Sequence, residues 1–134
     1  MKAIYLLLGF VLAAALFPRT TGAADKPAKP ANSTKLLHVV SLKFKPSASA
    51  EQIAQVVEAF RDLKKKIPAI QELEWGVNVS PEKHDKGFTH GFLLAFKSDK
   101  DRDEYLVHPD HKAFGKMLGP ILDDVFVIDY WAQR

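Results

Sequence analysis

The chain has 134 residues, a length that allows one domain, and it contains no cysteine. Without cysteine there is no disulfide framework, no thiol nucleophile and no lipidated cysteine, so the folded state depends on packing. Lys and Arg number 19 against 16 Asp and Glu, and no basic stripe with interleaved aromatic residues is present, which argues against a nucleic-acid partner.

The N-terminus is typical of a secretory signal peptide. Lys2 precedes an uninterrupted apolar run, Ala3–Phe17, and the small residues Thr20–Ala24 follow. The run is shorter than the roughly 20 residues that span a bilayer. We expect residues 1–24 to be a signal peptide cleaved after Ala23 or Ala24, which leaves a secreted or periplasmic protein with a net charge of about +1 and no stable membrane association. An uncleaved anchor stays open as an alternative, because only one lysine precedes the run and Arg19 follows it.

The next segment, residues 25–34, is expected to be a flexible linker. It contains two prolines and no large apolar side chain, so it cannot bury enough surface to offset the entropy of ordering. The folded domain is then expected to cover residues 35–134. Its first element is predicted to be a strand, Leu36–Phe44, because this segment is rich in β-branched and apolar residues on both faces.

A helix is predicted after this strand. Ser49 and Gln52 form a capping-box pattern, in which each side chain bonds an unpaired backbone N–H at the start of a helix. Apolar residues such as Val56 and Phe60 then recur at helical spacing. The helix should end before Pro68, since the residue before a proline disfavours helical geometry.

Two further strands are predicted in the middle of the chain. Residues Leu73–Val79 alternate between apolar and polar side chains, which indicates a half-buried strand. A polar connector, Ser80–Gly87, leads to a second extended apolar segment, Phe88–Phe96. We expect the two strands to form a hairpin.

The last third of the chain is predicted to contain helical segments and one strand. Ser98 and Asp101 cap a helix that should end at His108-Pro109, and a short helix can restart after the proline. The final strand is Val125–Trp131.

The predicted order is therefore β-α-β-β-α-β, that of a ferredoxin-like plait, an α+β fold with both helices on one face of the sheet. The first, third and last strands are apolar on both sides, whereas a sheet with one solvated face should alternate. No remaining segment is long enough to cover the second face. We expect a second copy of the domain to cover it, in a homodimer joined through the open sheet face.

Several segments of the chain resemble the stress-responsive A/B barrel (Dabb) domain family. They are LLHVVSLKFKP, KKIPAI, ELEWGVNVS, GFTHGFLLAF and EYLVHPDHKAFG, and the resemblance runs from about Lys35 to Tyr130. Its most specific element is the Y-x-x-H-P-x-H signature at Tyr105–His111. The resemblance implies a dimeric α+β barrel, in which two ferredoxin-like sheets pack face to face. Many members of this family have no known activity.

The chain also resembles one catalytic branch of the family, the plant polyketide cyclases of the olivetolic acid cyclase type. That resemblance implies a cofactor-independent enzyme with His111 as the acid/base and Tyr105 as the group that orients an oxygen. It also implies that an apolar substrate pocket is lined by His38, His90, Phe60 and Phe114. Burial among apolar neighbours would depress the pKa of such histidines and favour the neutral ring, which can accept a proton.

Other interpretations of these residues stay open at the level of the sequence. His38 and His90 can be core residues, Tyr105 can be a core tyrosine with its hydroxyl at the surface, and the signature can shape the turn around His108. Export argues against an enzyme that acts on thioester-derived polyketides, which are made inside cells. We therefore favour a stable dimer that binds a small apolar molecule or serves in stress tolerance, with the cyclase as the alternative. Haem handling, known in the wider barrel superfamily, lacks identifiable ligand residues here.

A metal site is not expected. His108 and His111 have spacing that suits a metal pair, but Pro109 between them breaks the helical register that would aim both rings at one ion. No phosphate-binding loop or nucleophile elbow occurs either. We expect no cofactor.

Overall fold

The structure is a computed structural model that describes residues 28–31 and 33–133. The predicted signal peptide and its cleavage sites lie outside the described residues, as does part of the predicted linker. No helix in the described part is long and apolar enough to cross a membrane. The elements in chain order are β1 (Leu36–Phe44), α1 (Ala50–Lys66), β2 (Glu72–Val77), β3 (His90–Phe96), α2 (Asp99–Val107), α3 (Pro109–Leu118), a 3₁₀ turn (Gly119–Ile121) and β4 (Leu122–Trp131).

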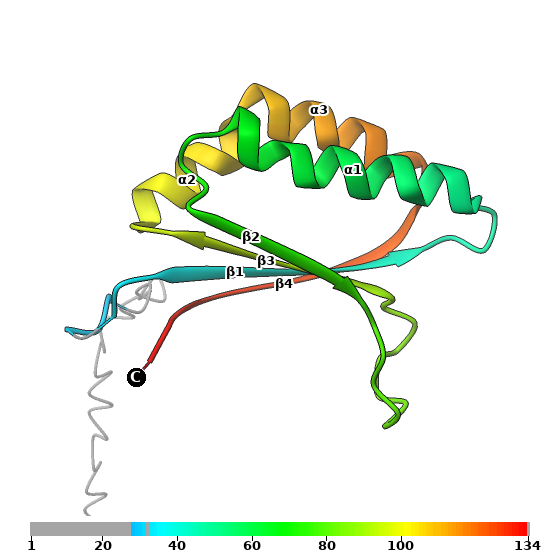
Figure 1. The fold of residues 1–134 in the computed structure, drawn as a ribbon, viewed down its shortest axis with the longest axis horizontal. Coiled ribbons are helices and arrows are strands. Elements are labelled where there is room, and N and C mark those ends of the chain that lie inside the picture. The colour runs from blue at the N-terminus through cyan, green and yellow to red at the C-terminus, as the bar shows by residue number, and fades with distance from the viewer. Residues whose placement is uncertain (1–27, 32, 134) are drawn as a thin grey trace, which may run out of the picture.

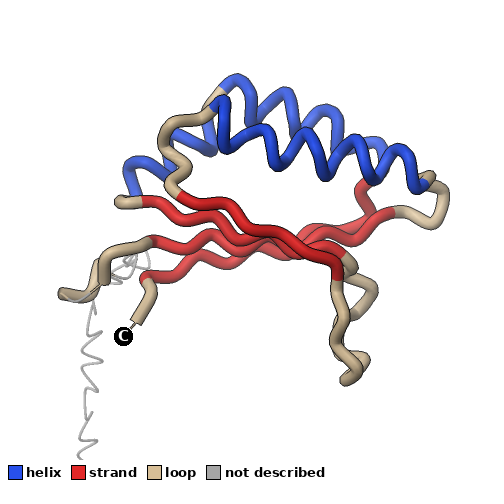
Figure 2. The backbone as a smooth tube through the Cα atoms, in the orientation of Figure 1, coloured by secondary structure: helices blue, strands red, loops and turns tan. Residues whose placement is uncertain are grey.

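The strands form one antiparallel sheet in the order β2-β3-β1-β4, and the helices lie on one side of it (Figure 1). Figure 2 shows the two layers, with the connector between β2 and β3 extending below the sheet, away from the helices. This arrangement confirms the predicted ferredoxin-like α+β fold. It places β1 in the centre of the sheet, where it pairs with β3 on one side and with β4 on the other.

Local signals explain where the helices begin and end. The backbone N–H of Gln52 donates to Ser49 Oγ at 3.1 Å and the backbone N–H of Ser49 donates to Gln52 Oε1 at 2.9 Å, so the predicted capping box is present. Helix α1 ends at Lys66, two residues before Pro68. Between α2 and α3, His108 has an extended backbone and its Nδ1 accepts the backbone N–H of Asp110 at 3.2 Å. His108 therefore ends one helix and caps the next, as Pro109 requires.

The core lies between the helices and one face of the sheet. Alternate residues of β1 and β3 point into it, and α1 contributes the side chains that face them. The largest of its fully buried side chains include Phe60, Phe92 and Phe96. Phe60 and Phe92 stack with ring centroids 3.9 Å apart, which locks α1 onto β3.

The opposite face of the sheet is apolar and exposed. Phe126, Ile128 and Tyr130 alternate along β4 and are 50%, 44% and 44% exposed. They pair across the sheet with Ser41, Val39 and Leu37 of β1, which continue the same face. No helix in the described part of the chain covers this surface, so the predicted second apolar face is present.

Three strands begin or end at residues other than those predicted. Strand β2 ends at Val77 rather than at Val79, whose side chain is 92% exposed, and Trp75 within it is 41% exposed. The predicted half-buried strand is therefore mostly exposed, because β2 is an edge strand. Strand β3 begins at His90 rather than Phe88, and β4 begins at Leu122 rather than Val125.

Candidate functional site

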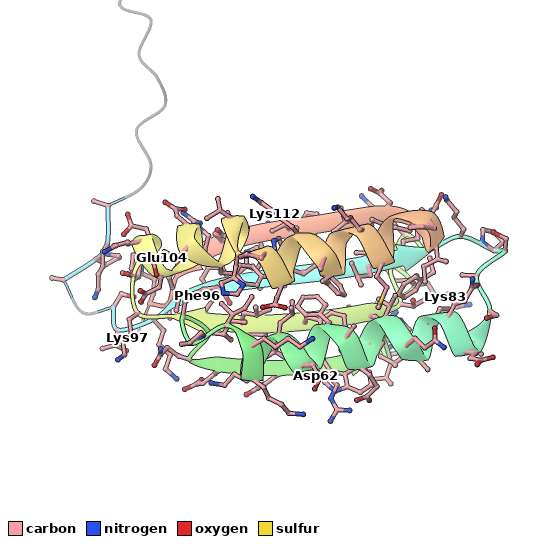
Figure 3. The ribbon with its side chains drawn as sticks, turned by 90° about the horizontal axis from the view of Figure 1, so that it is seen from above. Asp62, Lys83, Phe96, Lys97, Glu104 and Lys112 are labelled. Atoms are coloured by element: carbon pink, nitrogen blue, oxygen red, sulfur yellow. The ribbon has the colours of Figure 1, made fainter. Side chains whose placement is uncertain are left out.

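The signature residues meet a histidine of the central strand beneath the helices. Tyr105, on α2, is 1% exposed, and its ring centroid lies 4.3 Å from that of His111 on α3. On its other side lies His38 of β1, with ring centroids 5.6 Å apart. The ring centroids of Phe96, on β3, and Tyr105 lie 5.3 Å apart. Figure 3, which looks down on the helices, labels Phe96 between α1 and α2. We refer to His38, Tyr105 and His111 as the histidine–tyrosine cluster.

The turn between α2 and α3 brings Tyr105 and His111 together. The backbone N–H of His108 donates to the carbonyl of Tyr105 at 3.1 Å, and Pro109 then starts α3 in a new direction. As a result His111 turns back over the end of α2, where its Nδ1 lies 3.2 Å from the carbonyl oxygen of Leu106. A carbonyl can only accept, so Nδ1 carries the hydrogen and the lone pair of the neutral ring is on Nε2.

Burial shifts the pKa values of Tyr105 and His111 in opposite directions. It lowers the pKa of His111 below its usual 6.5, the nearby His38 and His108 rings lower it further, and the bond to Leu106 opposes this shift. Burial also raises the pKa of the Tyr105 hydroxyl well above its usual range, with a contribution from the charge of Asp129. His111 is thus biased towards the neutral base, while Tyr105 keeps its proton and can donate it in a hydrogen bond.

A charged network, which the sequence analysis did not predict, supports His38. Asp129 of β4 pairs with His38 across the sheet, and its Oδ1 lies 2.6 Å from His38 Nδ1. The guanidinium of Arg102 on α2 donates from Nη1 to the other carboxylate oxygen of Asp129 and from Nε to Asp103 at 2.7 Å. The side chains of His38 and Arg102 are only 6% and 10% exposed. These carboxylates outweigh the effect of burial and raise the pKa of Arg102 above its usual value.

The predicted pocket phenylalanines lie beside the cluster. Phe60 of α1 and Phe114 of α3 have ring centroids 4.8 Å apart, and both are buried. Phe114 is one helical turn from His111, so the two side chains share a face of α3. The structure therefore places both phenylalanines in the core, on the helical side of the sheet together with His111.

His90 lies apart from the cluster. It pairs with Leu42, four residues along β1 from His38, a separation of about 13 Å at the usual rise of a strand. Its ring contacts Phe44 at 5.2 Å, and its Nδ1 lies 2.9 Å from the hydroxyl of Thr89. Burial lowers the pKa of His90. The structure thus places His90 at the other end of the helix-facing side of the sheet, apart from the cluster.

The two histidines of the signature are committed to different partners. His108 Nδ1 caps α3 and His111 Nδ1 faces Leu106, so these nitrogens do not converge on one point. Within the described residues no group of three or more potential metal ligands occurs. His84, in the connector, is exposed.

Comparison with known proteins identifies the family. Residues 36–132 match the model of the Stress Responsive A/B Barrel Domain. A stress-response A/B barrel domain-containing protein of Arabidopsis thaliana is 36% identical over 93 residues, which are 69% of this chain and 85% of that protein. Olivetolic acid cyclase of Cannabis sativa is 28% identical over 97 residues, 72% of this chain and 96% of the cyclase.

Solved structures give the same fold. The hydroxynitrile lyase of Passiflora edulis superposes with a TM-score of 0.71 at 26% identity, and the match covers 75% of this chain and 95% of the lyase chain. A dimeric ferredoxin-like protein of unknown function from Jannaschia sp. CCS1 has a TM-score of 0.65 at 26% identity, with 73% and 99% of the two chains covered.

Proposed function

This chain belongs to the stress-responsive A/B barrel domain family, and we propose that it is an exported homodimer that binds a small apolar carbonyl compound at the histidine–tyrosine cluster. The contact between Tyr105 and His111 carries the proposal. No hydrogen bond joins the Tyr105 hydroxyl to another described residue. In the described part of the chain, every fully buried side-chain nitrogen or oxygen has a partner, so the unpartnered Tyr105 hydroxyl is not fully shielded from solvent. The hydroxyl is therefore free to donate a hydrogen bond to a carbonyl oxygen, although Tyr105 as a whole is only 1% exposed.

Homodimer formation is supported by the open sheet face. Its exposed apolar residues on β4, Phe126, Ile128 and Tyr130, form a continuous surface with their partners on β1. Large exposed apolar patches on soluble proteins mark interaction sites. The similar protein from Jannaschia is described as dimeric. Native mass spectrometry of the processed protein at micromolar concentration should show a dimer, and a well-folded monomer would contradict this part of the proposal.

Export is supported by the sequence of residues 1–24 alone. The test is to determine the first residue of the protein recovered from outside the cytoplasm of its host. We expect the mature chain to start at Ala24 or Asp25. A chain that still carries the apolar run would indicate a membrane anchor instead.

A second candidate function is catalysis of proton transfer without a cofactor. Two relatives favour it, because one is named as a cyclase and the other as a hydroxynitrile lyase. In an intramolecular aldol-type cyclisation, Nε2 of His111 would take a proton from a carbon next to a carbonyl. The electron pair left on that carbon would form a bond to a second carbonyl carbon of the same molecule. Tyr105 would donate a hydrogen bond to the resulting alkoxide, which then takes up the proton held on Nε2 of His111 and restores the neutral base.

One experiment separates binding from catalysis. Nonane-2,4-dione, an apolar β-diketone, is added to the protein in D₂O, and NMR follows both the His111 ring signals and the exchange of the protons between the two carbonyls. A saturable shift of His111 without faster exchange supports the binding function. Exchange faster than in buffer, abolished by His111→Gln and reduced by Tyr105→Phe, supports the catalyst. Absence of any shift or acceleration contradicts both functions.

A further inference from the structure

A hollow of about 470 Å³ opens where the starts of β1 and α2 meet the end of β4. Its walls are largely apolar and include Leu36, Tyr130 and Trp131 from the sheet and Pro30 from the segment before β1. The volume falls within the roughly 300–1,000 Å³ typical of small-molecule sites. Neither His111 nor Tyr105 lines this hollow, so it is distinct from the histidine–tyrosine cluster.

The segment before β1 forms one wall of the hollow, closes a turn on itself and contacts the end of β4. The backbone N–H of Ser33, a residue only 4% exposed, donates to the carbonyl of Pro30 at 3.0 Å. The ammonium of Lys29 lies 5.2 Å from the centroid of the Trp131 ring, a cation–π contact. Ala28 and Pro30, on either side of Lys29, therefore line the hollow beside Trp131.

One charged pair, Arg102 and Asp129, faces this hollow. Arg102 bonds Asp129 through Nη1 and Asp103 through Nε, which leaves Nη2 as a donor for a molecule in the hollow. An anionic ligand would meet the carboxylates of Asp129 and Asp99, which also lines the hollow. A cationic ligand would meet Arg102 itself and would compete with Lys29 for the face of Trp131. The charges therefore favour an uncharged ligand.

We propose that this hollow is a second binding site, for a small neutral molecule with an apolar body and one hydrogen-bond-accepting oxygen that Arg102 recognises. The aromatic and aliphatic walls bury the body of the molecule, and the guanidinium supplies the directional contact. Asp129 links the two sites, since its Oδ1 bonds His38 of the cluster while its Oδ2 holds Arg102. This proposal stands independently of the function proposed for the cluster.

Three seven-carbon probes that differ in their polar group test the class of ligand: 2-heptanone, heptanoate and heptylammonium. Binding is followed by the indole N–H signals in NMR, with Trp131 as the reporter and Trp75, on the opposite edge of the sheet, as the internal reference. We expect 2-heptanone to shift the Trp131 signal saturably without moving that of Trp75. The two charged probes should bind at least tenfold more weakly.

Matched variants place the ketone in the hollow. Ala28→Trp fills it from the anchored segment, whereas Ala31→Trp makes the same substitution at an exposed neighbour that does not line it. Arg102→Lys keeps the positive charge beside Asp129 but removes the forked guanidinium. We expect the affinity for 2-heptanone, read from the Trp131 signal, to fall at least tenfold in Ala28→Trp and Arg102→Lys and to be unchanged in Ala31→Trp. The proposal is overturned if 2-heptanone leaves Trp131 unmoved, if a charged probe binds as tightly, or if Ala28→Trp binds like the wild type.

Discussion

Replacing Asp129 by alanine should destabilise the domain far more than removing an acid from a surface ion pair. Asp129 holds both His38 and Arg102, whose side chains are 6% and 10% exposed. Removing one partner of a buried ion pair typically costs 3–5 kcal/mol, because the other charge stays buried without compensation. The Asp129 side chain is itself 25% exposed and Asp103 still contacts Arg102, so we expect the lower end, about 3 kcal/mol.

The loss is measured by urea denaturation at equal protein concentrations, since any oligomer makes stability depend on concentration. For a domain of this size the expected fall in Tm is about 12 °C or more. Glu72→Ala serves as the matched control. It removes the carboxylate from a 2.5 Å ion pair with Lys35, but both side chains are about half exposed, so the expected loss is about 0–1 kcal/mol.

A double variant tests the cause of this loss. If the cost of Asp129→Ala comes from leaving Arg102 uncompensated, then adding Arg102→Leu should recover part of the lost stability. Two outcomes would refute the reasoning: a loss for Asp129→Ala no larger than that for Glu72→Ala, or a double variant whose loss equals the sum of the two single losses.

Three further predictions concern the core, the open face and pH. Phe92→Ala, which removes the ring stacked on Phe60, should cost about 3–5 kcal/mol in urea denaturation, and a loss below about 1 kcal/mol would contradict the packing described. Ile128→Asp should shift the proposed dimer to monomer in native mass spectrometry while the circular dichroism stays unchanged; a persisting dimer would place the interface elsewhere. The lowered pKa of His111 means that the unfolded chain binds its proton more readily, so stability should fall as pH drops below about 6.5, and His111→Gln should flatten that fall.

The parts of the fold that were predicted correctly depend on signals carried by neighbouring residues. The capping box of Ser49 and Gln52 marked the start of α1, and the proline after His108 marked the break between α2 and α3. The bounds of β1 were also predicted correctly, because an apolar strand on both faces is a property of the segment itself. The open sheet face followed from the same observation.

The ends of the other strands depend on partners that are distant in sequence, and there the prediction was wrong by two or three residues. Val79 continues the alternation of β2, but it has no neighbouring strand to pair with once β3 begins at His90. Strand β4 starts at Leu122 because that residue pairs with Phe44, next to an irregularity in the register of β1. Hydrophobic alternation alone does not reveal such partners.

For the candidate site, the sequence indicated the residues of the cluster but not the network behind it. Tyr105 and His111 lie within one signature, and His38 is buried on the helix-facing side of β1. Asp129 is 91 residues from His38 and meets it only through the register of β1 and β4. A usable signal did exist. If the first and last predicted strands pair antiparallel with Leu36 opposite Trp131, then His38 lies opposite Asp129.

The position of this network suggests what it contributes to the cluster. Buried ion pairs often stabilise a fold no more than apolar side chains of the same volume, so stability alone does not explain Arg102 and Asp129 in this layer. A carboxylate can only accept hydrogen bonds, so Asp129 requires the hydrogen of His38 to be on Nδ1. Arg102 in turn keeps the carboxylate oriented. The network therefore orients the His38 ring, with the hydrogen on Nδ1 directed at Asp129, beside a His111 whose pKa is lowered and a Tyr105 whose hydroxyl keeps its proton.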